Sequence, residues 1–192
     1  MLGFACALPN LLSNVMKSKL GFSLIELVVT LSIIIIILAF TIPSQTIFLT
    51  KTNQNIASQQ LLHAISLAHS EAILRGVPVS LCKSKDHTTC SGNWDDGQII
   101  FTDDNRDGIV IDKSHVLTVL DPLKGATLHW RSALSRDYLQ ILSNGLSTEN
   151  GSFWYCTVKA DNPAWAIRIS QTGRARLEYP DQTGKINGLS CH

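Results

Sequence analysis

Apolar residues form one long run near the start of the chain, from Phe22 to Ile42. A helix needs about 20 apolar residues to cross the hydrocarbon core of a bilayer. Lys17 and Lys19 precede the run, and basic residues mark the cytoplasmic side of a membrane helix. The small residues of a signal-peptidase site do not follow the run. The pattern therefore predicts a retained membrane-spanning helix whose N-terminus is cytoplasmic.

A helical pattern continues beyond the apolar run. Small and aliphatic residues recur at helical spacing over the next thirty or so positions: Ala57, Leu61, Ala64, Ile65, Ala68 and Ala72. Arg75, Gly76 and Pro78 together form a helix stop signal. Pro43 lies inside the combined helix and is expected to kink or loosen it. We therefore predict one long helix from Phe22 to Arg75, with an amphipathic second half.

After Gly76 the pattern changes to short segments of β-branched and aromatic residues, separated by Gly, Asn, Asp and Pro. Such a series is expected to form an antiparallel sheet or a small sandwich, which makes the protein α+β. The predicted strands are Val77–Cys82, Gln98–Thr102, Val116–Leu120, Ala126–Trp130, Tyr138–Leu142, Ser152–Val158, Trp165–Ser170 and Arg174–Tyr179.

Five cysteines are present, and all except Cys6 lie in this β-rich region. An even set indicates disulfides and an oxidising compartment. Four cysteines allow three pairings. We favour Cys82–Cys90 across a short loop and Cys156–Cys191 at the tail. The alternative is a metal site of Cys82, His87 and Cys90, although a structural zinc site usually has four protein ligands.

The net charge of +1 says little about partners, but the charges are unevenly distributed. Six Asp and one Arg lie between residues 95 and 112, which makes this segment acidic. Asp103, Asn105 and Asp107 match the first half of a calcium-binding loop, but Ser114 stands where the loop needs Glu. Asp107–Gly108 is also a common hairpin turn. We favour the turn and keep calcium as the alternative.

The C-terminal part is mildly basic, and its charge gathers on a predicted hairpin around Gly173. Side chains alternate along a strand, so Arg174 and Arg176 share one face, about 7 Å apart. This spacing is similar to that of consecutive phosphates on a nucleic-acid strand. Gly173 is expected to allow close backbone approach and to offer a free amide. Further candidate contacts are Arg168, Lys185 and Lys159. The alternative is a solvated strand face on which Glu178 offsets Arg176.

Glu26 is the unusual residue of the apolar run, because an unpaired carboxylate in a membrane segment is costly. The simple alternative is that it snorkels to the interface. Its surroundings, Gly21 to Leu27 (GFSLIEL), closely resemble the processing motif of type IV pilins and type II secretion pseudopilins. The resemblance implies cleavage between Gly21 and Phe22 by a prepilin peptidase, N-methylation of Phe22, and pairing of Glu26 with the N-terminal amine of a neighbouring subunit.

Family leaders are usually short and basic, and residues 16–21 would be a typical one. We therefore expect translation to start at Met16. Residues 94–108 (WDDGQIIFTDDNRDG) resemble the corresponding region of the FimT and GspH minor pilin group. Residues 173–176 (GRAR) resemble the GRxR motif of FimT-type pilins that bind DNA during natural transformation.

The resemblance implies the type IV pilin fold. Its expected parts are a leader (1–21), a membrane and filament-core helix (22–43), an amphipathic continuation (44–76) and a β-rich domain (77–192). The expected function is that of a minor pilin binding extracellular double-stranded DNA for uptake. The alternative is a structural minor pilin or a GspH-like pseudopilin that primes or tips assembly.

The expected partners are other pilins, the prepilin peptidase, DNA and the inner membrane. The protein would span that membrane once, with its β-rich domain in the periplasm, until assembly places it in a surface pilus. The sequence contains no catalytic constellation, phosphate loop or zinc signature, so we expect neither an enzyme nor a cofactor.

Overall fold

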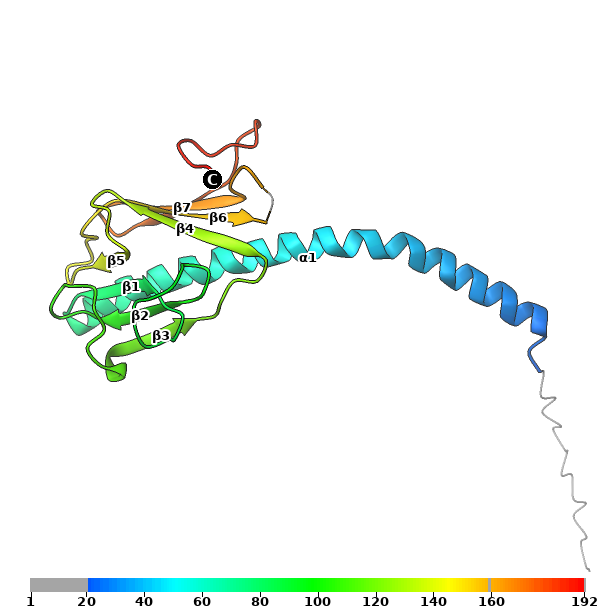
Figure 1. Ribbon diagram of the computed structural model, residues 1–192, viewed down its shortest axis with the longest axis horizontal. Helices are drawn as coiled ribbons and strands as arrows, with labels where there is room; N and C mark the ends of the chain where they lie inside the picture. The colour runs from blue at the N-terminus through cyan, green and yellow to red at the C-terminus, as the bar shows by residue number, and fades with distance from the viewer. Residues whose placement is uncertain (1–20, 159, 192) are drawn as a thin grey trace, which may run out of the picture. The chain divides into compact units, whose positions relative to one another are not determined.

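The computed structural model describes residues 21–158 and 160–191, without the side chains of residues 40–47. The expected leader, the start at Met16 and Lys159 lie outside the described residues, as does the side chain of Pro43 and with it the predicted kink. Two compact units, Met1–Ile47 and Phe48–His192, divide the chain. Helix α1 (Leu24–Arg75) begins in the first unit and ends in the second (Figure 1).

A capping interaction starts α1. The backbone N–H of Glu26 donates to Ser23 Oγ at 3.4 Å, and the N–H of Leu27 donates to the Ser23 carbonyl at 3.1 Å. Ser23 with Glu26 three residues later is the pattern of a capping box. Glu26 also places its carboxylate in the first turn, where it complements the helix dipole.

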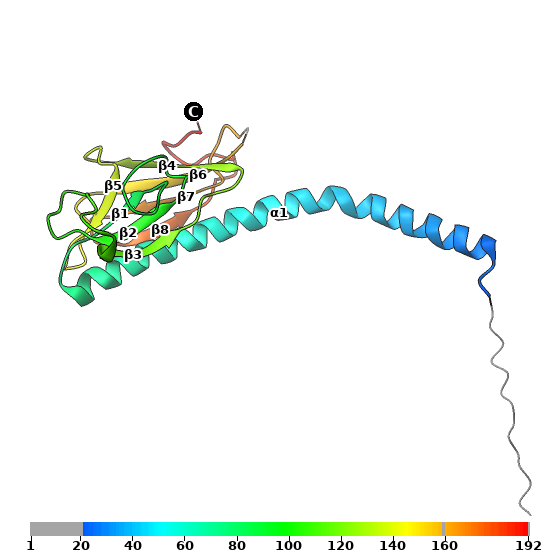
Figure 2. The same ribbon diagram turned by 60° about the horizontal axis from the view of Figure 1, so that its bottom comes forward.

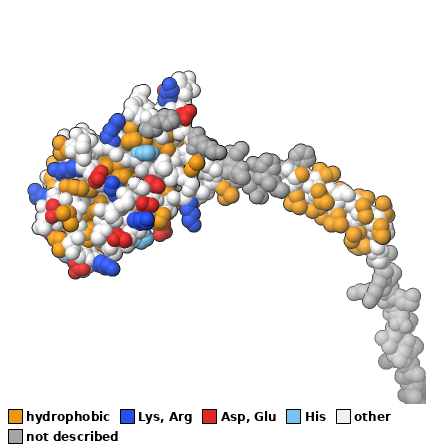
Figure 3. Space-filling view, viewed as in Figure 1, with side chains coloured by type: hydrophobic (Ala, Val, Ile, Leu, Met, Phe, Trp, Pro, Cys, Tyr) orange, Lys and Arg blue, Asp and Glu red, His pale blue; other side chains and the backbone are white. Residues whose placement is uncertain are grey.

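Residues 21–39 are all exposed, and Figure 3 shows apolar side chains along the visible face of this part of α1. Phe22 is 73% exposed, and each residue from Ile33 to Leu38 is at least half exposed. Among the described residues, no helix has the length and hydropathy required to span a bilayer.

In the second unit, α1 buries the predicted stripe of small and aliphatic side chains, and the helix ends at Arg75 as predicted. Gly76 follows in the left-handed region (φ +68°), where glycine is favoured, and its N–H donates to the Ala72 carbonyl.

Two four-stranded antiparallel sheets pack with this part of α1 (Figures 1 and 2). The first sheet has the order β3-β2-β1-β5, and the second has the order β4-β6-β7-β8. All eight predicted strands are present, with ends shifted by at most two residues: β1 (Val79–Lys83), β2 (Gln98–Thr102), β3 (Val116–Leu120), β4 (Ala126–Ser132), β5 (Tyr138–Ile141), β6 (Gly151–Thr157), β7 (Trp165–Ile169) and β8 (Ala175–Glu178). A short 3-10 helix, η1 (Lys113–His115), precedes β3.

One hydrophobic core joins the inner faces of both sheets to α1, and it includes Ile65, Leu81, Phe153 and Ile167. Two smaller clusters lie on the outer faces. On the first sheet, Val110 packs on Ile99 and Phe101. On the second, Ile186 and Leu189 pack on β7. The C-terminal tail therefore covers part of the outer face of the second sheet.

Two disulfides are present, Cys82–Cys90 and Cys156–Cys191, and this is the pairing that the sequence analysis favours. The first disulfide engages both sulfurs of the alternative metal site, so that interpretation is wrong. The second fixes the tail to β6. Within the loop that Cys82–Cys90 closes, hydrogen bonds from Thr88 and Thr89 lower the pKa of the exposed Asp86 well below its ordinary value.

Candidate nucleic-acid interface

The predicted basic hairpin is present as β7 and β8, and β8 is the edge strand of its sheet. In its turn, the Ser170 N–H donates to the Arg174 carbonyl, and the Gly173 N–H donates to the Ser170 carbonyl at 2.9 Å. The prediction of a free Gly173 amide is therefore wrong, because the turn itself uses that donor.

Gly173 has a different role, which is close packing. It is buried with φ +73°, and a Cβ at this position would clash with the Gly145 carbonyl oxygen and lie 2.7 Å from His69 Cδ2. Only glycine tolerates both that backbone conformation and that contact. Gly173 thereby holds the hairpin turn directly against α1 and the turn before β6.

Strand register places an arginine-containing row across the outer face of the second sheet. Arg176 pairs with Arg168, Arg168 with Ser152, and Ser152 with Arg131. Directly paired residues of antiparallel strands have their side chains on the same face. The structure thus adds Arg131, which the sequence analysis missed because nothing local in the sequence reveals that β4 and β8 flank β6 and β7.

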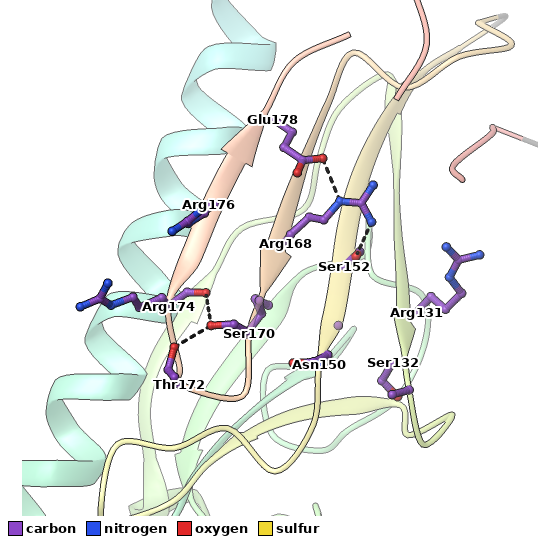
Figure 4. A pocket seen from close by; sticks show the side chains of 13 residues that line it. Arg131, Ser132, Asn150, Ser152, Arg168, Ser170, Thr172, Arg174, Arg176 and Glu178 are labelled. Atoms are coloured by element: carbon purple, nitrogen blue, oxygen red, sulfur yellow. Dashed lines mark hydrogen bonds and ion pairs between the residues drawn. The ribbon is translucent and has the colours of Figure 1, made fainter. Parts of the chain in front are cut away.

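A groove of about 710 Å³ follows this row (Figure 4). Four arginines and one carboxylate line it, with hydroxyl and amide groups between them: Arg131, Ser132, Ala133, Asn150, Gly151, Ser152, Arg168, Ile169, Ser170, Thr172, Arg174, Arg176 and Glu178. This lining is strongly cationic, which favours an anionic ligand.

Two of the four arginines already have protein partners. Arg168 Nε donates to Glu178 at 2.8 Å, and its Nη2 donates to the Asn187 carbonyl at 2.7 Å. Arg131 Nη2 donates to the Gly188 carbonyl at 3.0 Å. These two guanidinium groups hold the C-terminal tail against the sheet.

Arg174 and Arg176 differ from them, and we call this pair the arginine ridge. Both are exposed, and within the described part of the chain neither guanidinium has a hydrogen bond or an ion pair. In the alternative interpretation Glu178 offsets Arg176, but the ion pair that Glu178 forms is with Arg168. In Figure 4 the ridge side chains leave β8 on the side away from Arg168.

A second groove, of about 430 Å³, lies on the other side of the ridge, between β8 and α1. Its lining combines the hairpin with one face of α1: Leu62, Ile65, Ser66, His69, Gly173, Arg174, Ala175 and Arg176. The ridge therefore separates two grooves and lines both.

Lys185, another predicted contact, lines neither groove. Its segment folds around Asp181, whose carboxylate accepts hydrogen bonds from the Thr183 hydroxyl and from the Lys185 and Thr183 amides. These bonds, with a smaller contribution from the Lys185 charge, lower the pKa of Asp181. The tail therefore partly offsets the charge of Lys185.

The acidic loop, residues 103–112, is organised by Asp103, which is 2% exposed. Asp103 Oδ2 accepts hydrogen bonds from Ser80 Oγ, Gln140 Nε2 and the Gly108 N–H, and Oδ1 accepts one from the Asp107 N–H. The residues described contain no group of three or more His, Cys, Asp or Glu that could hold a metal. Asp103 is thus engaged by protein donors, which leaves the calcium interpretation unsupported.

Asp107 and Gly108 also do not form the predicted hairpin turn. β2 and β3 pair directly, but thirteen residues including η1 connect them. The loop folds back because Asp103 binds two of its amides and Val110 packs on the outer face of the first sheet.

Comparisons with known proteins agree with this architecture. The family model described as type II transport protein GspH matches residues 57–173. The fold is similar to that of the type IV minor pilin FimU of Pseudomonas aeruginosa, with 22% identity and a TM-score of 0.54 over 76% of this chain and 99% of that chain. The minor pseudopilin EpsH of the Vibrio cholerae type II secretion system has 15% identity and a TM-score of 0.49, over 69% of this chain and 99% of that chain. No curated protein sequence matches significantly.

Proposed function

The chain belongs to the GspH family of minor pilins and pseudopilins, and from that premise we propose that it binds extracellular double-stranded DNA through the arginine ridge and supports DNA uptake in natural transformation. Other pilins are its partners in the filament. The α+β architecture is the type IV pilin fold.

The observation that carries the DNA proposal is the exposure of two arginines that have no partner among the described residues. Arg174 and Arg176 are exposed at an edge strand, whereas Arg131 and Arg168 each hold the tail. Their separation of about 7 Å along the strand suits neighbouring phosphates. Arginine donors match the oxygens of a phosphate diester bidentately.

Binding of this kind is electrostatic and largely independent of base sequence, because phosphate contacts position a duplex without identifying its bases. The groove on the outer face of the sheet supplies further polar groups from Ser170, Thr172 and Asn150. We expect a dissociation constant in the micromolar range that weakens steeply with salt.

The N-terminal part has the assembly role in this proposal. Prepilin peptidase cleaves between Gly21 and Phe22, Phe22 is N-methylated, and the exposed Glu26 carboxylate pairs with the amine of a neighbouring protomer. The apolar surface of α1 is covered by the inner membrane before assembly and by other pilins afterwards. The two disulfides are consistent with a periplasmic globular domain.

The direct test uses the full chain in a nonionic detergent, with fluorescence anisotropy of two short duplexes of unrelated sequence across a salt series. We expect equal affinity for both duplexes and a linear fall of log K with log salt. Absence of binding at low salt would contradict the DNA proposal and favour the alternative, a structural subunit that primes or tips assembly. In cells, deletion is expected to reduce transformation while pili remain.

A further inference from the structure

His69 lies in the groove between α1 and β8, together with both residues of the arginine ridge. Its ring packs against Gly173, so the same glycine that sets the turn also fixes the distance between His69 and β8. The ring is half-buried, and within the described residues it has no hydrogen-bond partner. Ser66 lies one turn earlier on α1 and lines the same groove.

This groove concentrates hydrogen-bond donors without protein acceptors. On the outer face of the sheet, Arg131 and Arg168 donate to tail carbonyls and to Glu178. In the α1–β8 groove, by contrast, two free guanidinium groups face an imidazole and a hydroxyl, and no carboxylate belongs to the lining. An anion with several oxygens is the complement of such a lining.

We propose that the groove between α1 and β8 is a seat for a backbone phosphate of DNA, in which His69 adds a third cationic donor to the arginine ridge when it is protonated. The inference rests on the proposed function and extends it, because it places one wall of the DNA site on the helix and makes binding depend on pH.

The sign of that dependence follows from the charges around the ring. The charged groups facing His69 are Arg174 and Arg176 of β8; α1 contributes Ser66, Leu62 and Ile65, and the turn before β6 contributes Gly145. The negative charge of a phosphate bound beside the ring favours the protonated imidazole. DNA binding therefore takes up a proton and tightens as the pH falls through the range in which histidine titrates.

The experiment measures duplex affinity and its salt dependence for the full chain in nonionic detergent, between about pH 8 and about pH 5.5. Affinity is expected to rise roughly fivefold on acidification, and the slope of log K against log salt is expected to steepen by about 0.9, the value of one added phosphate contact. His69→Gln is expected to remove both changes. His69→Lys, with a permanent charge, is expected to bind at the higher pH as tightly as the unaltered protein does at the lower.

His63→Gln is the matched control, because His63 lies on the same helix but lines a different groove, beside β3. It is expected to keep the full pH response. The melting temperature of each variant shows whether a loss of affinity comes from the site or from unfolding. A His69→Lys variant that is folded but gains no affinity at the higher pH overturns the proposal.

Other results would also overturn it. If His69→Gln keeps the pH response, another group causes that response and the role of His69 is wrong. The proposal of DNA binding would be unaffected, because the salt series tests it independently. Displacement of DNA by inorganic phosphate, at a concentration similar to that of the DNA phosphates and at constant ionic strength, would assign the seat to free phosphate. Absence of duplex binding at every pH would remove both proposals.

Discussion

The acidic loop and the arginine ridge are both rich in charged residues, but the surroundings of their side chains differ. Asp103 is buried, and four protein donors surround its carboxylate. Arg174 and Arg176 are exposed, and no acceptor within the described residues binds them. A buried charge must be satisfied inside the protein, whereas an exposed one is free to bind a partner.

This contrast separates charges that maintain the fold from charges available for binding. The same distinction holds within one hairpin. Glu178 pairs with Arg168, and Arg168 also holds the tail, whereas no acceptor among the described residues binds the ridge. Substitution of the buried Asp103 should therefore change stability, and substitutions in the ridge should change binding.

The largest effect is expected for Asp103→Asn. The amide group cannot accept four hydrogen bonds, so the donors of Ser80 and Gln140 lose a charged partner in a buried site. We expect the free energy of unfolding to fall by about 3 kcal/mol, measured by denaturant titration, with unchanged DNA affinity of the folded fraction. Asp104→Asn, at an exposed neighbour, is the control and should change stability little. Equal effects of the two would contradict the structural role of Asp103.

Next in size is the double variant Arg174→Gln with Arg176→Gln. Loss of two phosphate contacts is expected to reduce duplex affinity about 30-fold at low salt and to lower the salt slope by about 1.8. The melting temperature should not change, because neither side chain has a partner in the described protein. Arg106→Gln removes an exposed arginine of the acidic loop and should leave binding intact. Unchanged affinity of the double variant would remove the ridge from the site.

A smaller effect is expected for Gly173→Ala compared with Gly184→Ala. Both glycines have φ +73°, but only Gly173 has neighbours that a Cβ would meet. Strain in the left-handed region is common to both variants, so their difference isolates the packing of the turn on the Gly145 carbonyl and on His69. We expect Gly173→Ala to be less stable by about 2 kcal/mol in chemical denaturation. Similar stabilities would mean that the turn moves freely away from α1.

The smallest effect is expected for Glu178→Gln, which removes the carboxylate of the outer groove and releases Arg168. Duplex affinity should rise about twofold at low salt, and stability should fall by less than about 1 kcal/mol, since the ion pair is partly exposed. Asp181→Asn removes a tail carboxylate outside the groove and serves as the charge-matched control. A loss of affinity in Glu178→Gln would show that Arg168 must be held in place for binding.

Local sequence signals predicted most of the secondary structure. The end of α1 at Arg75 followed from Gly76 and Pro78, and β2 and β3 lie at the predicted residues. These signals succeed because capping, turn formation and strand alternation depend on neighbours only a few residues apart. Local signals were less reliable for Asp107–Gly108, where a hydrogen-bond network to Asp103 replaced the expected turn.

By itself, the sequence determined the order of the elements, the α+β class, and the position of a cationic hairpin near the C-terminus, because each depends on periodicity or composition within a short window. Only the tertiary structure decided which charges are free. Strand pairing aligned Arg131 with Arg168 and Arg176, the tail engaged two of these three, and packing of Gly173 on α1 placed His69 beside the ridge. Availability for binding depends on contacts between residues far apart in the chain, and only folding creates those contacts.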